Sequence, residues 1–183
     1  MQTSAFNIPI YNTSLTFNCE KLNEYCYSMK SKFDGRRMSN TGWQCVIKER
    51  LDIEKDINDY INEFASNIGF KKTQKVNQMW ININGNKDFN MPHVHLNSHF
   101  SGVFYSKLPK NSGKLVFQNP CEGIYYLWDN LEKENTTADN AFTYEITPKE
   151  KELYIFPSWL RHYVEANLSD EDRISISFDS IGV

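Results

Sequence analysis

The chain has 183 residues, a formal net charge of -3 and 40% hydrophobic residues. This length fits one domain that buries a sizeable core, and the small negative charge argues against nucleic-acid binding through bulk charge. No run of about 18 apolar residues occurs, and the N-terminus lacks a charged segment followed by an apolar one. We therefore expect neither a membrane span nor a signal peptide, and a cytoplasmic location.

The first third of the chain is predicted to be mainly helical. FNIPIY is expected to form a strand, and the stretch 19–33 a helix that ends at Gly35, because glycine accepts the left-handed cap conformation. A second helix is predicted within 52–70, where apolar residues recur at steps of three and four and Gly69 follows. Its apolar positions are Ile53, Ile57, Tyr60, Ile61, Phe64 and Ile68. This stripe predicts a helix that packs on the protein core.

From residue 73 onward, apolar residues alternate with a period of two in eight short runs separated by turn residues. The runs are QKVNQMWININ, HVHL, SGVFYSKL, GKLVFQ, TYEITP, ELYIFP, RHYVEAN and RISISFD. Short strands of this kind indicate a mainly β fold, a jelly roll with the helices packed outside it. We predict a single domain, with a helical part at 1–72, a jelly-roll core at 73–183 and a surface loop or lid at 129–141.

Three of the four histidines fall within NMPHVHLNSHF. If HVHL is a strand, His93 and His95 point to the same face with their Cα atoms about 6.5 to 7 Å apart. Two imidazoles at that spacing can bind one metal ion, and a third ligand must come from elsewhere in the chain. Among the histidines the candidates are His99, four residues on, and His162, which opens another predicted strand.

The sequence RISIS begins eleven residues after His162. Strand alternation places Arg173 and Ser175 on one face, directed into the barrel. A buried guanidinium without a partner is unfavourable, and its planar shape suits a carboxylate. A metal site beside an inward-pointing arginine therefore implies an acidic cosubstrate.

Five further motifs occur in order along the chain. They are SNTGW at 39–43, WININ at 80–84, HVH at 93–95, SGVFY at 101–105 and FPSWLRH at 156–162. Together with RISIS they resemble the 2-oxoglutarate and Fe(II)-dependent oxygenase superfamily, and more narrowly a group of such oxygenases found in bacteria and marine phages. The resemblance covers nearly the whole chain. A phage-encoded member would act in the host cytoplasm.

The resemblance implies a double-stranded β-helix fold and a dioxygenase that uses Fe(II) and 2-oxoglutarate, with ascorbate as a supporting reductant. Such an enzyme releases succinate and carbon dioxide and hydroxylates a substrate, which is unidentified here. The implied iron ligands are His93, His95 and His162, and the residues implied to bind the cosubstrate are Arg173, Ser175, Tyr105, Asn82 and Asn84. No catalytic residue is implied beyond the metal ligands.

The second ligand departs from the superfamily pattern, which usually has Asp or Glu where His95 stands. Three neutral ligands leave Fe(II) with its full charge, which dianionic 2-oxoglutarate would offset, and zinc or nickel can displace iron from such a set. An alternative pairs His95 with Asn97 and leaves His93 outside the metal shell. His99 is expected to lie in a turn, beside the ligands or the substrate.

Two other functions stay open at this point. One is a cupin-like metal dioxygenase that uses three histidines without 2-oxoglutarate. The other is a non-catalytic jelly-roll module that holds a structural zinc, in which case His99 would close the site. We favour the 2-oxoglutarate oxygenase because of the ordered motifs. The expected partners of this oxygenase are its small-molecule cosubstrate and its substrate. We expect it to bind neither nucleic acid nor a membrane, and homodimerisation is a further hypothesis.

Overall fold

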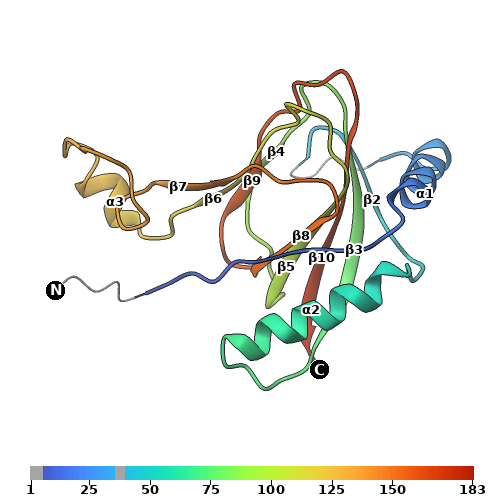
Figure 1. Cartoon of the computed structure of the whole chain (residues 1–183), viewed down its shortest axis with the longest axis horizontal. Helices are drawn as coiled ribbons and strands as arrows, with labels where there is room; N and C mark the ends of the chain where they lie inside the picture. The colour runs from blue at the N-terminus through green and yellow to red at the C-terminus, as the bar shows by residue number, and fades with distance from the viewer. Residues whose placement is uncertain (1–5, 36–39) are drawn as a thin grey trace.

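The structure is a computed structural model that describes residues 6–35 and 40–183, with the strands arranged in two sheets (Figure 1). The large sheet has the order β1 (Tyr11–Ser14), β8 (Glu152–Pro157), β5 (Phe100–Lys107), β10 (Arg173–Gly182), β3 (Gln74–Asn84) and β2 (Trp43–Val46). The small sheet has the order β4 (Asn90–His93), β9 (His162–Val164), β6 (Leu115–Gln118) and β7 (Thr143–Ile146). All of these neighbours pair antiparallel.

From β3 onward the chain winds back and forth between the two sheets. Strands β3, β5, β8 and β10 lie in the large sheet, and β4, β6, β7 and β9 lie in the small one. This winding is the double-stranded β-helix, so the predicted jelly-roll fold is confirmed. Each predicted run overlaps one of these strands, although HVHL shares only its first residue, His93, with β4.

Alternation along β10 gives the large sheet two different faces. Ile174, Ile176 and Phe178 are fully buried in the core that the helices share with the sheet. Arg173 and Ser175, on the opposite face, are also buried and line a pocket between the two sheets. The large sheet is therefore apolar under the helices, whereas its inner face carries the polar residues of β10 beside an apolar cluster that includes Val103, Tyr154 and Phe156.

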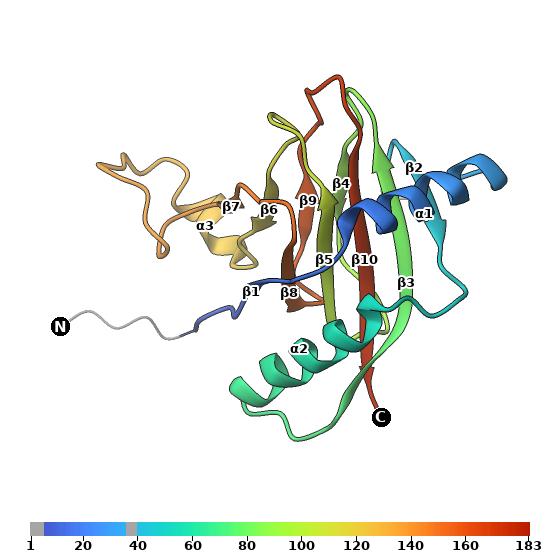
Figure 2. The ribbon, with the colours of Figure 1, turned by 45° about the vertical axis from the view of Figure 1, so that its right-hand side comes forward.

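Helices α1 (Cys19–Lys32) and α2 (Ile53–Asn67) cover the outer face of the large sheet (Figure 2). The predicted stripe on α2 faces the core, since Ile53, Ile57 and Ile61 are fully buried. Gly69 has a φ of 91°, the left-handed conformation that ends this helix as predicted. None of the helices in the described ranges is long and apolar enough to cross a membrane.

The part of the chain before β3 holds both long helices, but it also supplies β1 and β2 to the edges of the large sheet. The strand predicted from FNIPIY begins only at Tyr11. The predicted glycine cap of α1 is wrong, because Gly35 does not adopt a positive φ and the helix ends before Phe33, which is extended. The Phe33 carbonyl accepts a hydrogen bond from Trp43 Nε1 at 3.1 Å, so the side chain of the first residue of β2 contacts the end of α1.

Residues 119–142, between β6 and β7, project from the barrel and are called the arm below (Figures 1 and 2). The arm contains the short helix α3 (Glu122–Leu127), which the sequence did not predict. Residues 129–141 form no helix or strand, as expected for a surface loop. The Tyr125 hydroxyl donates to the Phe142 carbonyl at 2.7 Å, which joins the two sides of the arm.

Candidate metal centre and cosubstrate pocket

Two of the predicted ligands face each other on paired strands. His93, the last residue of β4, pairs with His162, the first residue of β9. His95 lies in the loop beyond β4, so the prediction that HVHL is a strand is wrong. The loop leaves the small sheet because it turns at Asn97, with a φ of 62°, to enter β5 in the other sheet. The His95 backbone N–H donates to the Ser158 carbonyl at 2.9 Å instead of to β9.

The three imidazole rings nevertheless converge. One nitrogen each of His93, His95 and His162 lies within 4.8 Å of the other two. The rings of His95 and His162 are stacked, with 5.1 Å between their centroids and 3.3 Å between their Nε2 atoms. Two nitrogen ligands that bind one metal ion at about 2.1 Å stand roughly 3.0 to 3.4 Å apart. The separation therefore fits a shared metal ion.

Hydrogen bonds on the far side of each ring define which nitrogen is free. His93 and His162 each donate from Nδ1 to the backbone carbonyl two residues earlier, at 2.6 and 2.8 Å. His95 Nδ1 lies 2.9 Å from a carboxylate oxygen of Asp179. Because these oxygens accept, each Nδ1 carries a proton, which leaves Nε2 of each ring as the nitrogen that faces the shared space and can bind a metal.

The surroundings keep the rings in the form that binds metals. Burial lowers the pKa of His162 well below its ordinary value, and burial also lowers the pKa of His93. The edge of Phe156 packs on His162 with 4.5 Å between ring centroids, and Trp80 stacks on His95 at 5.5 Å. The metal candidate site is therefore walled by aromatic rings, and His162 in particular stays neutral at neutral pH.

Arg173 lines the same pocket as the histidines and is 1% exposed. Its Nη1 donates to the backbone carbonyls of Ser112 and Glu165, but its Nη2 has no partner. The buried hydroxyl of Tyr105 also lacks a partner, and burial raises the pKa of Tyr105 to about 12, so the phenol keeps its proton. Ser175 lies opposite Tyr105 on the paired strand. A buried cation and a buried donor, both incompletely paired, mark a place for an anion.

The two predicted asparagines are placed differently. Asn82 lines the pocket, but its Oδ1 accepts from Asn40 and Gln44, both at 3.1 Å, and its Nδ2 donates to Ser177 at 3.0 Å. Asn84 donates to Asn40 Oδ1 at 2.7 Å and is not among the residues that line the pocket. The structure thus brings Asn82 to the pocket wall with its amide already engaged, and it holds Asn84 outside that wall.

His99 lies apart from the other histidines. Its Nδ1 is 2.9 Å from the backbone N–H of Gly182, which donates to it. The metal-ligand cluster found in the described residues contains His93 and His95 but not His99. Asn97 is an exposed turn residue, so the geometry favours the pair of His93 and His95 over the pairing of His95 with Asn97.

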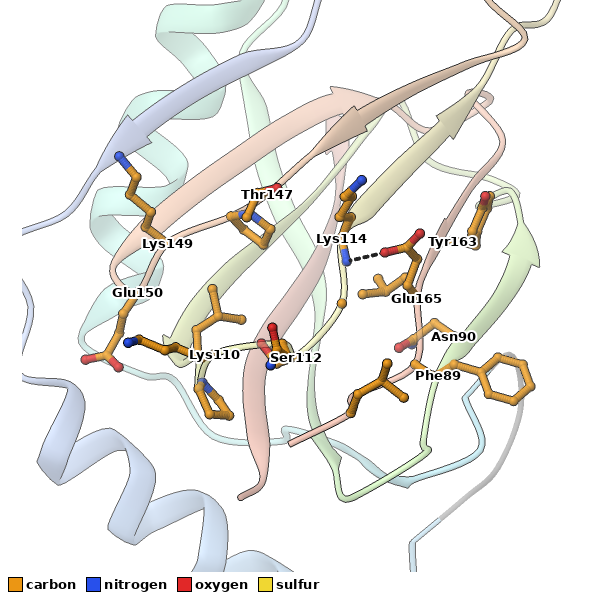
Figure 3. A pocket seen from close by; sticks show the side chains of 18 of the residues that line it. Phe89, Asn90, Lys110, Ser112, Lys114, Thr147, Lys149, Glu150, Tyr163 and Glu165 are labelled. Carbon is orange, nitrogen blue, oxygen red and sulfur yellow. Dashed lines mark hydrogen bonds between the residues drawn. The ribbon is translucent and has the colours of Figure 1, made fainter. Parts of the chain in front are cut away.

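A larger pocket of about 1140 Å³ is lined by the loops that precede β6 and β8, by the loop that follows β9, and by residues of β4 and β9 (Figure 3). The charged residues around it are Lys110, Lys114, Lys149, Glu150 and Glu165. Ser112 and Glu165, whose carbonyls accept from Arg173, belong to its lining. The guanidinium therefore lies behind the wall of this pocket, which includes none of the predicted site residues.

Sequence reasoning missed two polar residues of the site. Asp179 continues the alternation that begins at Arg173 on β10, so the run RISISFD already contained the signal for an inward-facing carboxylate. Asn40 belongs to the SNTGW motif and is 1% exposed within the amide network of Asn82. Ser39 of that motif lies outside the described residues.

The family model described as "Putative 2OG-Fe(II) oxygenase" matches residues 78–179. The chain belongs to this family. The protein is an Fe(II)- and 2-oxoglutarate-dependent dioxygenase, so the predicted family, enzyme class and cofactors are confirmed. The matched range contains every predicted site residue, from Asn82 to Ser175. Curated protein sequences give no significant match to this oxygenase.

Several solved structures share the fold of this oxygenase. A prolyl-4-hydroxylase of Pseudomonas putida is 13% identical, with a TM-score of 0.63 over 94% of this chain and 92% of that one. The viral collagen prolyl hydroxylase of Paramecium Bursaria Chlorella virus-1 is 12% identical, with a TM-score of 0.63 over 95% and 96%. The epimerase SnoN from nogalamycin biosynthesis is 12% identical, with a TM-score of 0.67 over 96% and 79%. These likenesses confirm the double-stranded β-helix.

Proposed function

We propose that this oxygenase hydroxylates a C–H bond of its substrate, with iron held by His93, His95 and His162 and 2-oxoglutarate anchored by Arg173. The observation that carries the proposal is the convergence of the imidazole nitrogens and an incompletely paired guanidinium on one pocket. When bound, Fe(II) and 2-oxoglutarate would supply the chemistry that activates dioxygen: one oxygen atom enters succinate as 2-oxoglutarate loses carbon dioxide, and the other hydroxylates the substrate. Two of the similar folds are prolyl hydroxylases, which supports hydroxylation as the reaction class.

The arrangement of the imidazoles supports a metal ion between them. Nε2 of His95 and Nε2 of His162 face each other at 3.3 Å while both Nδ1 protons are engaged elsewhere. Two lone pairs at this distance repel each other, and a metal ion between them replaces that repulsion with two bonds. Three protein ligands also leave coordination positions open, as a catalytic site requires.

The groups around Arg173 support an anchored carboxylate. Nη2 of Arg173 and the hydroxyl of Tyr105 are donors without acceptors, and the distal carboxylate of 2-oxoglutarate offers two oxygens. Ser175 is a third donor on the same wall. The ligand imidazoles bring no negative charge, so the dianionic cosubstrate offsets the charge of both Fe(II) and Arg173.

The structure gives the two alternative functions less support. A closed zinc site needs a fourth ligand, and His99 instead accepts from the backbone of Gly182. A three-histidine dioxygenase without 2-oxoglutarate leaves the buried guanidinium of Arg173 without an anion, which is costly.

The ligand set is tested by anaerobic equilibrium dialysis of the full chain against Fe(II). His93→Ala, His95→Ala and His162→Ala are each expected to abolish or strongly weaken iron binding, because each removes one of three bonds. His99→Ala is the matched control and is expected to bind iron like the unmodified protein. Iron binding that survives the three ligand substitutions, or that is lost in His99→Ala, contradicts the assignment.

The cosubstrate site is tested by calorimetric titration of 2-oxoglutarate into the iron-loaded protein without oxygen. Arg173→Gln is expected to raise the Kd for 2-oxoglutarate by about 30-fold or more, because a buried charge pair loses one partner. Lys149→Gln removes a cation from the larger pocket instead and is expected to leave this Kd unchanged. An unchanged Kd in Arg173→Gln together with a raised Kd in Lys149→Gln would instead assign the cosubstrate to the larger pocket.

The cellular location and the assembly state stay predictions. We propose a cytoplasmic enzyme, which the four unpaired cysteines support, since reducing compartments keep thiols free. The absence of nucleic-acid binding rests on the composition alone, and homodimerisation rests on the helical face of a small jelly roll.

A further inference from the structure

Asp179 is a buried carboxylate that points at a proposed iron ligand. The residue is 8% exposed, and one of its oxygens lies 2.9 Å from Nδ1 of His95. Ser101, paired with Asp179 across β5 and β10, donates its hydroxyl to the same oxygen at 2.6 Å. The carboxylate is therefore held on the inner face of the large sheet, on the side of the His95 ring away from the other histidines.

A second set of contacts ties the loop of His95 to this carboxylate. The Ser101 and Ser158 hydroxyls are 2.8 Å apart, and the Ser158 carbonyl accepts the backbone N–H of His95 at 2.9 Å. Trp80 covers the face of the imidazole. The position of the His95 ring is thus set by its backbone hydrogen bond to Ser158, by the stacked indole of Trp80 and by the hydrogen bond from Nδ1 to Asp179. These contacts hold the ring although His95 lies outside any strand.

The charge of Asp179 lacks the usual partner. Within the described ranges no lysine or arginine nitrogen lies within ion-pair distance of it, and His95 is its one ion-pair contact. Burying a carboxylate is unfavourable unless a compensating charge or strong donor is close. Across the His95 ring from Asp179 lies the space where one nitrogen of each histidine converges, and a metal ion bound there would supply such a positive charge.

We propose that Asp179 is a positioning residue that raises the metal affinity of the site through His95. A carboxylate that accepts from Nδ1 fixes the tautomer and the orientation of the ring and makes Nε2 a stronger donor to the metal. The three neutral ligands then act beside one negative charge, although no carboxylate touches the metal. This inference rests on the proposed ligand set, because it requires His95 to bind the ion.

The test uses Co(II) as the probe, titrated into the metal-free full chain without 2-oxoglutarate. Asp179→Asn keeps the shape and one acceptor oxygen but removes the charge, whereas Asp179→Ala removes both. Loss of such a carboxylate costs about 10- to 100-fold in metal affinity. We expect Asp179→Asn to lose about 10-fold in Co(II) affinity and Asp179→Ala to lose about 100-fold. The Co(II) d–d absorption bands should shift in both variants.

Ser101→Ala is the matched control, because it removes one hydrogen bond to the same oxygen and keeps the charge. It is expected to bind Co(II) more tightly than Asp179→Asn and to leave the absorption bands in place. Thermal unfolding of the metal-free proteins separates metal affinity from folding. Asp179→Asn should melt at the same temperature as the unmodified chain or higher, since it removes a buried charge without a cavity.

Unchanged Co(II) affinity and absorption bands in both Asp179 variants would overturn the role of Asp179. His95→Ala distinguishes that failure from failure of the ligand set. If His95→Ala loses Co(II) while the Asp179 variants bind normally, the ligand set stands and only the positioning role falls. If His95→Ala also binds normally, His95 is not a ligand and both proposals fall.

Discussion

The guanidinium of Arg173 is anchored on one side only. Nη1 is fixed by two backbone carbonyls, while Nη2 has no partner, and the Tyr105 hydroxyl, which also lacks one, belongs to the same pocket. An arginine held in this way is oriented before its ligand arrives, so little side-chain entropy is lost on binding. Both donors therefore act as parts of one preformed anion site.

Tyr105→Phe tests this anion site with the smallest possible change. The substitution removes one hydroxyl that has no hydrogen-bond partner among the described residues. Loss of a hydrogen bond to a charged group costs about 1.5 to 3 kcal/mol, so the KM for 2-oxoglutarate should rise about 10- to 100-fold. Steady-state kinetics with varied 2-oxoglutarate measures the effect, and Tyr125→Phe in the arm is the control. A KM that does not respond places the hydroxyl outside the cosubstrate site.

The buried His162 makes the stability of the metal-free protein depend on pH. Its pKa in the folded protein lies well below the ordinary value of 6.5, so the unfolded chain takes up the proton first as the pH falls. The free energy of unfolding should therefore decrease below about pH 6.5, at a limiting slope of about 1.4 kcal/mol per pH unit for this imidazole.

Urea unfolding at about pH 7.5 and about pH 5.5 measures this dependence. His162→Gln should show a smaller loss of stability between the two values than the unmodified chain. An equal loss in both proteins would mean that His162 does not contribute to the acid sensitivity.

At the scale of elements, α2 and the large sheet form a core that is separate from the pocket. Ile57 is fully buried between them, whereas Lys55 projects outward with 82% of its side chain exposed. Ile57→Ala should lower the free energy of unfolding by about 2 to 5 kcal/mol, because it leaves a cavity. Lys55→Ala should change it by less than about 0.5 kcal/mol.

Denaturant unfolding of both variants measures these differences. Iron affinity per folded molecule should be unchanged in Ile57→Ala, since the residue packs on the face of the sheet opposite the histidines. A specific loss of iron binding in this variant would show that the two faces are coupled.

The strands could be predicted from the sequence because their signals are local. ELYIFP matches β8 residue for residue, since its apolar run and the turn residues that flank it are neighbours in the sequence. The loop of His95 could not be predicted, because HVHL alternates as a strand does. The pairing of β4 with β9 ends there because the chain turns at Asn97 and the His95 N–H bonds to the Ser158 carbonyl. The left-handed cap at Gly35 failed for a similar reason, because the carbonyl of Phe33 is bonded by Trp43, ten residues on, a contact that no local pattern contains.

The candidate ligands were predictable by residue type, but the residues that hydrogen-bond to them were not. His93, His95 and Arg173 carry recognisable motifs, whereas the hydrogen bond between His95 and Asp179 joins segments that meet only through strand pairing in the large sheet. The engagement of Asn82 with Asn40 depends on the same long-range pairing. Such contacts follow from the register of strands far apart in sequence, which alternation does not determine.

At the scale of the whole molecule, the barrel and the arm are separable. Asn119 N–H donates to the Phe142 carbonyl at 2.9 Å, so the two ends of the arm are hydrogen-bonded to each other like the residues that flank a hairpin turn. Replacing residues 120–141 with Asn-Gly should therefore leave a closed hairpin between β6 and β7.

The shortened protein should stay folded and bind Fe(II) like the full chain, because no predicted ligand lies in the arm. Circular dichroism and iron dialysis check both points. The root of the arm lies beside His162, since Gln118 N–H donates to the Arg161 carbonyl at 2.9 Å. Loss of iron binding in the shortened protein would show that the arm supports the metal centre.

The most direct test of the central claim is the measurement of succinate and carbon dioxide from 2-oxoglutarate after oxygen is admitted to the Fe(II)-loaded protein. We expect equal amounts of both products, dependent on Fe(II) and 2-oxoglutarate and nearly abolished in His162→Ala and Arg173→Gln. Lys149→Gln should retain this turnover. Oxygen consumption without succinate, or succinate release that survives both site substitutions, would show that these residues do not form a 2-oxoglutarate-dependent oxygenase site.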